Sequence, residues 1–232
     1  MPIEVLDLGL NARALKAAEQ WRRTIVLPLQ SVPGCHNRSE VHLVGWKAAV
    51  LLGCLERHAR CLWLDANAEA RRPLASVRAA IDARGYFLTV AGHSFPTPKT
   101  VRPATLRLLG CDARPAQQAE CTSAYLGVRR GSLVHTALLP AMDACSRARD
   151  CLYPPDSVGN TNQRRDQSAL NAAICRVHAA TEHRVVCQTV RKFWMWHGQA
   201  TLLPTSDAAA WNSVVLFSRR AGAPPYAPSL SY

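Results

Sequence analysis

The sequence lacks several motifs that identify common classes of protein. Its nine cysteines include no Cys-x-x-Cys pair, which argues against a zinc ribbon or a thioredoxin-type redox site. It contains no phosphate-binding loop and no nucleophile elbow, which argues against the enzyme classes that those motifs define. No apolar run reaches the length of a transmembrane helix, and no internal repeat divides the chain. One globular domain is therefore the starting expectation for 232 residues.

Basic charge is abundant, although lysine is scarce. The formal net charge is +12, yet only four of the 28 basic residues are lysines, and the arginine pairs are scattered along the chain. Such a charge suits a nucleotide, a phosphate or an acidic glycan. Because no recognition motif accompanies it, nucleic acid is not an expected partner. A compositional bias toward arginine and alanine is the alternative explanation.

The cysteines and the first residues predict different compartments. Nine cysteines favour an oxidising environment, whereas MPIEVLDLGL has neither the basic start nor the apolar centre of a signal peptide. Cys145 and Cys151 are close enough in sequence to close a small disulfide loop, and so are Cys111 and Cys121, although sequence does not set the connectivity. The two lines agree if the chain is a fragment of a longer precursor.

The stretch from residue 46 to residue 65 organises the rest of the chain. Residues 46–58 are apolar on almost every side and predict a buried helix, and residues 61–65 predict a short buried strand. Asp65 then lies at the carboxyl end of that strand, where open α/β sheets bind ligands. Lys47 lies in the first turn of the helix, where its charge opposes the helix dipole, so we expect it to face an anion or open water.

Three other features carry structural expectations. Gly127 interrupts a predicted strand, at a point where another backbone or a ligand can approach closely. Residues 184–190 predict a further strand. Asp166 precedes apolar residues at helical spacing and is expected to cap a helix.

Six segments are distinctive in their order and spacing. They are VLDLGL at 5–10, GWKAAVLLGCLE at 45–56, CLWLDAN at 61–67, YLGVRR at 125–130, ACSRARDCLYPP at 144–155 and RRDQSALNAAI at 164–174. Together they resemble the nucleotide-diphospho-sugar transferase-like family, which has a GT-A type glycosyltransferase fold. The resemblance implies an α/β fold with a GT-A-like (Rossmann-like) central mixed sheet flanked by helices. It implies a single domain over residues 1–220, followed by an irregular tail at 221–232.

The resemblance also implies a glycosyltransferase of the Golgi or secretory lumen. The enzyme would transfer a sugar from a nucleotide-diphosphate donor to a hydroxyl of a glycan or protein acceptor, with the donor near Lys47, Asp65 and Asn67. A divalent metal, Mn²⁺ or Mg²⁺, would be held by Asp65 and Asn67, with His197 as a late ligand. Each of these residues also has a structural alternative. Asp65 and Asn67 suit an ordinary turn, and Lys47 can pack its aliphatic stem while its charged head reaches water. His197 lies among aromatic residues that are typical of a core.

Asp166 is the candidate for the carboxylate that faces the acceptor, because GT-A enzymes place an acid at the start of a late helix near the sugar. Such a carboxylate must lie within about 3 Å of the hydroxyl that it deprotonates. A simple helix cap, worth about 1 kcal/mol, is the alternative. Arg164 and Arg165 beside it could pair with the donor phosphates through their planar forks, or could form a solvated pair.

Two departures from the family pattern favour a second hypothesis. The chain opens on the family's second strand, so the pocket for the nucleotide base would be incomplete. The turn Asp65-Ala66-Asn67 replaces an Asp-x-Asp turn, and a neutral amide oxygen weakens binding of a hard cation. The second hypothesis is a catalytically inactive GT-A-like domain that binds a carbohydrate or a polyanion.

Overall fold

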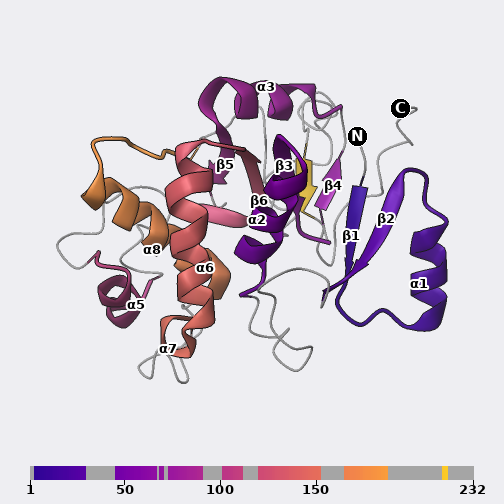
Figure 1. The fold of residues 1–232 in the computed structure, drawn as a ribbon, viewed down its shortest axis with the longest axis horizontal. Coiled ribbons are helices and arrows are strands. Elements are labelled where there is room, and N and C mark those ends of the chain that lie inside the picture. The colour runs from indigo at the N-terminus through magenta and orange to yellow at the C-terminus, as the bar shows by residue number, and fades with distance from the viewer. Residues whose placement is uncertain are drawn as a thin grey trace, which may run out of the picture.

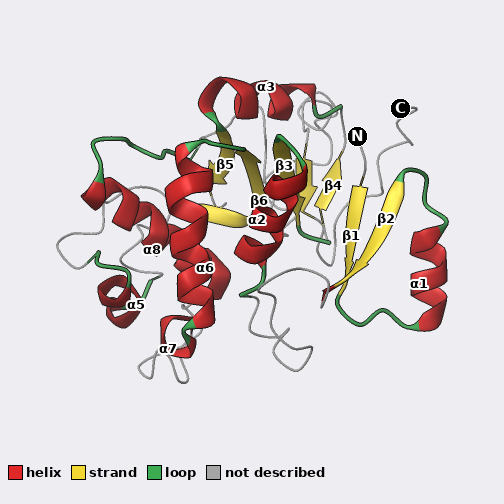
Figure 2. Cartoon of the chain, in the orientation of Figure 1, coloured by secondary structure: helices red, strands yellow, loops and turns green. Residues whose placement is uncertain are grey.

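A computed structural model gives the fold (Figures 1 and 2). It describes residues 3–29, 45–66, 68–70, 73–90, 101–111, 120–152, 165–187 and 216–218. The strands are β1 (Ile3–Asp7), β2 (Thr24–Pro28), β3 (Arg60–Leu64), β4 (Ala68–Ala70), β5 (Tyr86–Val90), β6 (Cys121–Arg129) and β7 (Leu216–Ser218). The helices are α1 (Ala12–Glu19), α2 (Lys47–Arg57), α3 (Ala75–Arg84), α5 (Pro103–Leu108), the π-helical turn η3 (Val134–Leu138), α6 (Leu139–Arg147), α7 (Arg149–Leu152) and α8 (Arg165–Ala180). None of the described helices combines the length and the apolar composition that crossing a bilayer requires.

The described strands form three small sheets. β1 and β2 pair in parallel, β3 and β5 pair antiparallel on either side of β6, and β4 pairs antiparallel with β7. The α/β class predicted from sequence is confirmed, and the fold is a single mixed α/β domain. The sequence predicted one central sheet with both parallel and antiparallel strands. Among the described strands, each sheet is instead either entirely parallel or entirely antiparallel. Apolar runs indicate where strands are buried, but they do not say which edges pair.

The three-stranded sheet carries helices on both faces. Helix α3 covers one face, where Ile81 packs with Phe87 and the buried Tyr125. Helices α2, α6 and α8 pack on the other face around the larger apolar core, which includes Leu126 and Leu170. Figure 1 shows α3 at the top, with α6 and α2 in front of the strands.

Gly127 differs from its prediction, because β6 runs through it without interruption. A Cβ built at this position would lie 2.7 Å from Ile81 Cδ1 and 2.8 Å from Phe87 Cβ. The missing side chain therefore allows α3 to pack closely on the sheet, and the approaching group is a core side chain.

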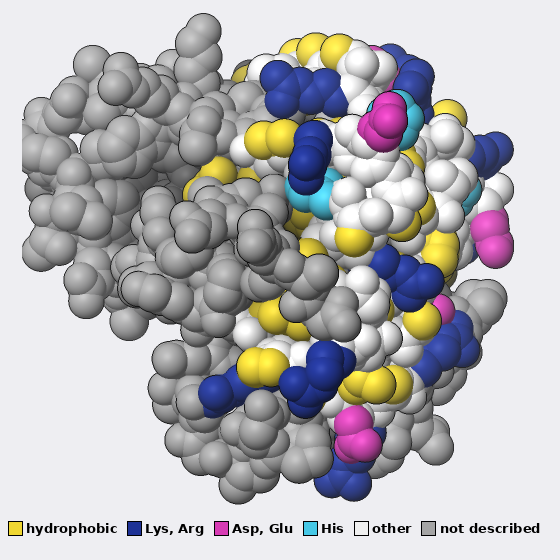
Figure 3. All heavy atoms as spheres, turned by 90° about the vertical axis from the view of Figure 1, so that its left-hand side faces the viewer, with side chains coloured by type: hydrophobic (Ala, Val, Ile, Leu, Met, Phe, Trp, Pro, Cys, Tyr) yellow, Lys and Arg dark blue, Asp and Glu magenta, His cyan; other side chains and the backbone are white. Residues whose placement is uncertain are grey.

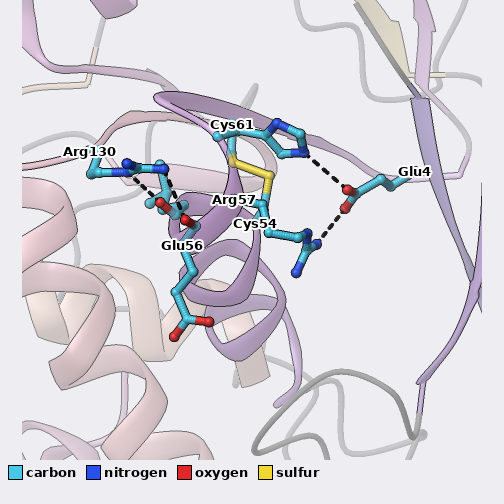
Figure 4. Close-up of a disulfide and its surroundings, with 8 residues drawn as sticks. Glu4, Cys54, Glu56, Arg57, Cys61 and Arg130 are labelled. Carbon is cyan, nitrogen blue, oxygen red and sulfur yellow. Dashed lines mark hydrogen bonds and ion pairs between the residues drawn. A yellow bond between two sulfur atoms is a disulfide. The ribbon is translucent and has the colours of Figure 1, made fainter.

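The N-terminal strands form a separate layer at one end of the molecule, with α1 on their outer side (Figure 1). Asn11 caps α1, because its side-chain oxygen accepts a hydrogen bond from the amide of Ala14. Glu4 of β1 ties this layer to the end of α2, where its carboxylate lies 2.9 Å from Arg57 Nη2 and 3.2 Å from His58 Nε2 (Figure 4).

Four disulfides connect the described elements. Cys54 pairs with Cys61 between α2 and β3 (Figure 4), and Cys145 pairs with Cys151 as the sequence allowed. The other two are Cys111–Cys175 and Cys121–Cys187, so the short loop between Cys111 and Cys121 was a wrong alternative. Both long-range disulfides join segments that packing, not sequence distance, brings together. Four disulfides are consistent with a secreted protein.

The predicted strand at 184–190 is not formed over its described part, residues 184–187. The amide of Val185 donates to His178 Nε2 at 2.9 Å, and the amide of Val186 donates to the Tyr86 hydroxyl at 3.1 Å. These backbone groups are therefore satisfied by side chains and not by a neighbouring strand.

Candidate functional site

Lys47, Asp65 and Asp166 meet at one edge of the three-stranded sheet. Lys47 is the first residue of α2, Asp65 follows β3, and Asp166 lies in the first turn of α8. Lys47 Nζ lies 2.7 Å from Asp65 Oδ1 and 2.6 Å from Asp166 Oδ2. Three segments far apart in the sequence therefore contribute one charged group each to what we call the Lys47 cluster.

The topology explains why these segments meet. Strand β6 runs antiparallel to β3, so the start of β6 lies beside the carboxyl end of β3. The amide of Asp65 continues this pairing by donating to the carbonyl of Ala124 at 3.0 Å. The start of α8 is held to the start of β6 by Asn171, whose side chain both accepts from the Cys121 amide and donates to the Cys121 carbonyl, at 2.8 Å each.

The Lys47 ammonium is buried and fully hydrogen-bonded. Its side chain is 7% exposed, and its third contact is with the carbonyl oxygen of Ser123 at 3.4 Å. An ammonium group has three donors, so two carboxylates and one carbonyl use all of them. The carboxylates are more accessible, because the Asp65 side chain is 33% exposed and that of Asp166 is 15% exposed.

The cluster sets the charge state of Lys47. Burial on its own lowers the pKa of the ammonium, because a charged group loses hydration. The carboxylate of Asp166, followed by that of Asp65, outweighs burial and raises the pKa above its ordinary value. Lys47 is therefore protonated at neutral pH, and the cluster holds two carboxylates and one cation.

Two tryptophans support the cluster. The indole N–H of Trp63 donates to Asp65 Oδ1 at 2.8 Å, which fixes the orientation of that carboxylate. Lys47 Nζ lies 5.7 Å from the centre of a Trp63 ring, within cation–π range. Trp46 packs edge-on against Trp63, with ring centroids 5.1 Å apart. Trp63 is only partly buried, so part of its side chain remains accessible next to Asp65 in the structure.

Two buried polar side chains lie near the starts of β6 and α8 in the sequence. Glu120, which precedes β6, is 0% exposed, and neither carboxylate oxygen has a partner in the described part of the chain. Gln167, which follows Asp166, is 6% exposed, and its Nε2 also has no partner there. A buried polar group without a partner costs about 1–3 kcal/mol, so Gln167, which adjoins Asp166, is a candidate for pairing with a polar ligand.

The predicted site residues can now be placed. The dipole argument expected Lys47 to face an anion or open water, and the structure places it against two of the protein's own carboxylates. Asp166 lies within the first turn of α8, so the prediction that it precedes and caps the helix was wrong. The carboxylate binds Lys47. Helix α8 begins at Arg165. Three other candidates, Asn67, Arg164 and His197, lie outside the described residues, as does the predicted boundary at residue 220.

Sequence reasoning missed Trp63, Ser123 and Asn171. Trp63 could have been found, because residues two apart on a strand share a face and Trp63 precedes Asp65 by two. Ser123 contributes a backbone carbonyl, which no side-chain pattern identifies. Asn171 falls at an inward position of a predicted helix, where a polar residue among apolar ones indicates a hydrogen bond to a neighbouring element.

The described basic side chains on the face shown in Figure 3 form no single tract. On the face shown in Figure 3, lysine and arginine side chains lie in separate groups among apolar and acidic ones. Within the described residues, no three histidine, cysteine or carboxylate side chains are placed together as metal ligands. Comparisons with protein-family models, with curated proteins and with solved structures gave no match to this chain.

Proposed function

We propose that the chain is a glycosyltransferase-like domain that binds a nucleotide-diphosphate sugar beside the Lys47 cluster. The observation that carries this proposal is the meeting of Asp65 and Asp166 around one ammonium group. Sequence analysis assigned these two carboxylates to the donor and the acceptor respectively, from separate parts of the chain. A transferase requires both groups in one site.

The proposed chemistry is direct transfer to an acceptor hydroxyl. Asp166 accepts the proton of the hydroxyl as the acceptor oxygen forms a bond to the anomeric carbon. The bond from that carbon to the nucleoside diphosphate breaks, and its electron pair leaves on the phosphate oxygen. Because Lys47 engages Asp166 Oδ2, we assign the proton to Oδ1.

The positions of two helix N-termini also support an anionic donor at this edge. The N-termini of α2 and α8 both lie at the cluster, since Lys47 is the first residue of one and Asp166 is in the first turn of the other. The partial positive charge of a helix N-terminus favours a phosphate group. We extend the proposal to a glycan or protein acceptor and to the Golgi or secretory lumen, which the four disulfides support.

A carbohydrate-binding domain without catalysis is the second candidate. It is favoured by the saturation of Lys47, whose three donors are all used within the protein. Trp63 and Asp65 then provide a partly exposed ring beside a carboxylate, a pairing that suits the apolar face and the hydroxyls of a sugar.

Calorimetric titration with uridine and guanosine diphosphate separates these functions. The variants are Asp65→Asn and, as a matched control, Asp82→Asn, because Asp82 is a surface acid of α3 that pairs with Arg60. Saturable nucleotide binding that Asp65→Asn removes and Asp82→Asn keeps supports the transferase. Binding of a glycan array without nucleotide binding supports the second candidate. An absence of both, in folded protein, contradicts both.

A further inference from the structure

We propose that the Lys47 ammonium is the resident cation of this carboxylate pair, so that the site takes its ligand without a divalent metal. The resemblance implied Mn²⁺ or Mg²⁺ held by Asp65. Whether the groups around Asp65 suit such an ion depends on Lys47, whose ammonium group already lies between the two carboxylates.

The oxygens that a divalent ion would need already surround the Lys47 ammonium group. Asp65 Oδ1, Asp166 Oδ2 and the Ser123 carbonyl surround Lys47 Nζ at 2.7, 2.6 and 3.4 Å. Carboxylate and carbonyl oxygens are also the ligands that hard divalent cations prefer. The position where these oxygens converge is therefore the position of the ammonium group.

The net charge of the Lys47 cluster also disfavours a divalent ion. Two carboxylates and one ammonium leave one negative charge in excess, which is a weak attraction for a divalent ion. Such an ion would also have to lie close to the ammonium in a site of low accessibility, where repulsion between cations is poorly screened. The ammonium already lies 2.7 Å from Asp65 Oδ1 and 2.6 Å from Asp166 Oδ2, so the competing charge is present where the ion would bind.

Packing around Lys47 restricts its side chain from moving away from the carboxylates. Residue 47 begins a helix whose next two residues, Ala48 and Ala49, are 0% and 4% exposed. Lys47 itself is 5% exposed, and Trp63 lies beside its charged end. An ammonium displaced by a metal would need a new partner within a packed core, which makes displacement costly.

The decisive experiment is a titration of the folded full chain with Mn²⁺ alone, followed by electron paramagnetic resonance. We expect no saturable site at the cluster in the wild type. Lys47→Met leaves two carboxylates without their cation. We expect this variant to bind one Mn²⁺ with a Kd at least about tenfold lower than that of any weak Mn²⁺ binding by the wild type. Lys47→Met combined with Asp166→Asn should lose this gain. Lys16→Met, which removes an exposed lysine of α1, should behave as the wild type.

Two results would overturn the proposal. One is saturable Mn²⁺ binding by the wild type that Asp65→Asn or Asp166→Asn abolishes. The other is a folded Lys47→Met or Lys47→Gln protein that gains no Mn²⁺ binding. The first comparison needs no substitution at Lys47, so it decides the matter even if both Lys47 variants fail to fold.

The consequence for donor binding rests on the proposed function, whereas the metal titration does not. If the wild type binds a nucleoside diphosphate, EDTA should leave its affinity unchanged, and a loss of binding in EDTA would contradict metal independence. If it binds no nucleotide, the transferase proposal fails, and the Mn²⁺ titration still decides the role of Lys47.

Discussion

The two ends of helix α2 carry basic residues in opposite circumstances. At its N-terminus, Lys47 has the wrong sign for the helix dipole, is buried, and is held by Asp65 and Asp166. At its C-terminus, Arg57 has the right sign, is half exposed, and pairs with Glu4 of the N-terminal layer (Figure 4). The unfavourable position is thus the one that the protein has surrounded with compensating charge.

The C-terminal end is stabilised mainly by hydrogen bonds to its carbonyl groups. Arg130 donates to the carbonyl oxygens of Leu55 and Glu56 at 2.6 and 3.0 Å (Figure 4). These carbonyls have no amide partner within the helix, so an arginine there is doubly suited. This end of α2 is therefore compensated without burying a charge.

The comparison teaches that burial decides how much an ion pair contributes. Exposed pairs are worth about 0–1 kcal/mol, because water and salt screen them. Removing one partner from a buried pair costs about 3–5 kcal/mol, because the remaining charge has no compensation. The two ends of α2 should therefore respond very differently to substitution.

The largest effect is expected for Lys47→Met. It leaves two carboxylates without their cation, and we expect a loss of about 3 kcal/mol in the free energy of unfolding. The value lies at the lower end of the usual range because Asp65 is 33% exposed and can be hydrated. Urea denaturation measures it, with Lys16→Met as the control. A loss below about 1 kcal/mol would make the two ends of α2 equivalent.

A smaller effect should separate the two carboxylates. Asp166 is less exposed than Asp65, at 15% against 33%, so Asp166→Asn should cost more, about 2 kcal/mol against about 1 kcal/mol for Asp65→Asn. Paired urea denaturation curves test the order. The reverse order would mean that Trp63, which donates to Asp65, matters more than burial does.

Alkaline pH tests how much the charge of Lys47 contributes to stability. The ammonium has a folded-state pKa above its ordinary value of 10.5, so its contribution to stability is fully present below that pH. The contribution is lost as the pH rises through the higher folded-state pKa. The difference in Tm between the wild type and Lys47→Met should therefore be constant between about pH 7 and about pH 9, and should narrow above about pH 10.5. A difference that narrows already near neutral pH would contradict the raised pKa.

The smallest effect is expected at the other end of the helix. Glu4→Gln removes the exposed pairs with Arg57 and His58, and we expect it to cost no more than about 0.5 kcal/mol. Because these pairs are screened, the cost should fall further in concentrated salt. A loss comparable to that of Lys47→Met would show that docking of the N-terminal layer, and not burial, sets the scale.

Local features of this chain could be predicted from its sequence. The apolar runs at 46–58 and 61–65 placed the helix that begins at Lys47 and the strand that ends before Asp65. The dipole argument left an anion or open water as the surroundings of Lys47, and the structure shows two carboxylates there. These successes depend on neighbours in the chain, whose geometry is fixed by the element in which they lie.

Features that depend on distant segments could not be predicted in the same way. Cys111 pairs with Cys175 and not with Cys121, because α8 packs beside α5. The amide of Val185 donates to the side chain of His178, and residues 184–187, which were predicted as part of a strand, have irregular backbone. Both Lys47 and Asp166 were singled out, but their contact follows from the topology of β3, β6 and α8.

A double-mutant cycle between Lys47 and Asp166 tests the central claim most directly. The free energy of unfolding is measured for the wild type, Lys47→Met, Asp166→Asn and the double variant. Because the two groups are in contact, we predict a coupling of about 2 kcal/mol, with the double variant less destabilised than the sum of the single ones. Additive effects, with a coupling below about 0.5 kcal/mol, would contradict a shared site.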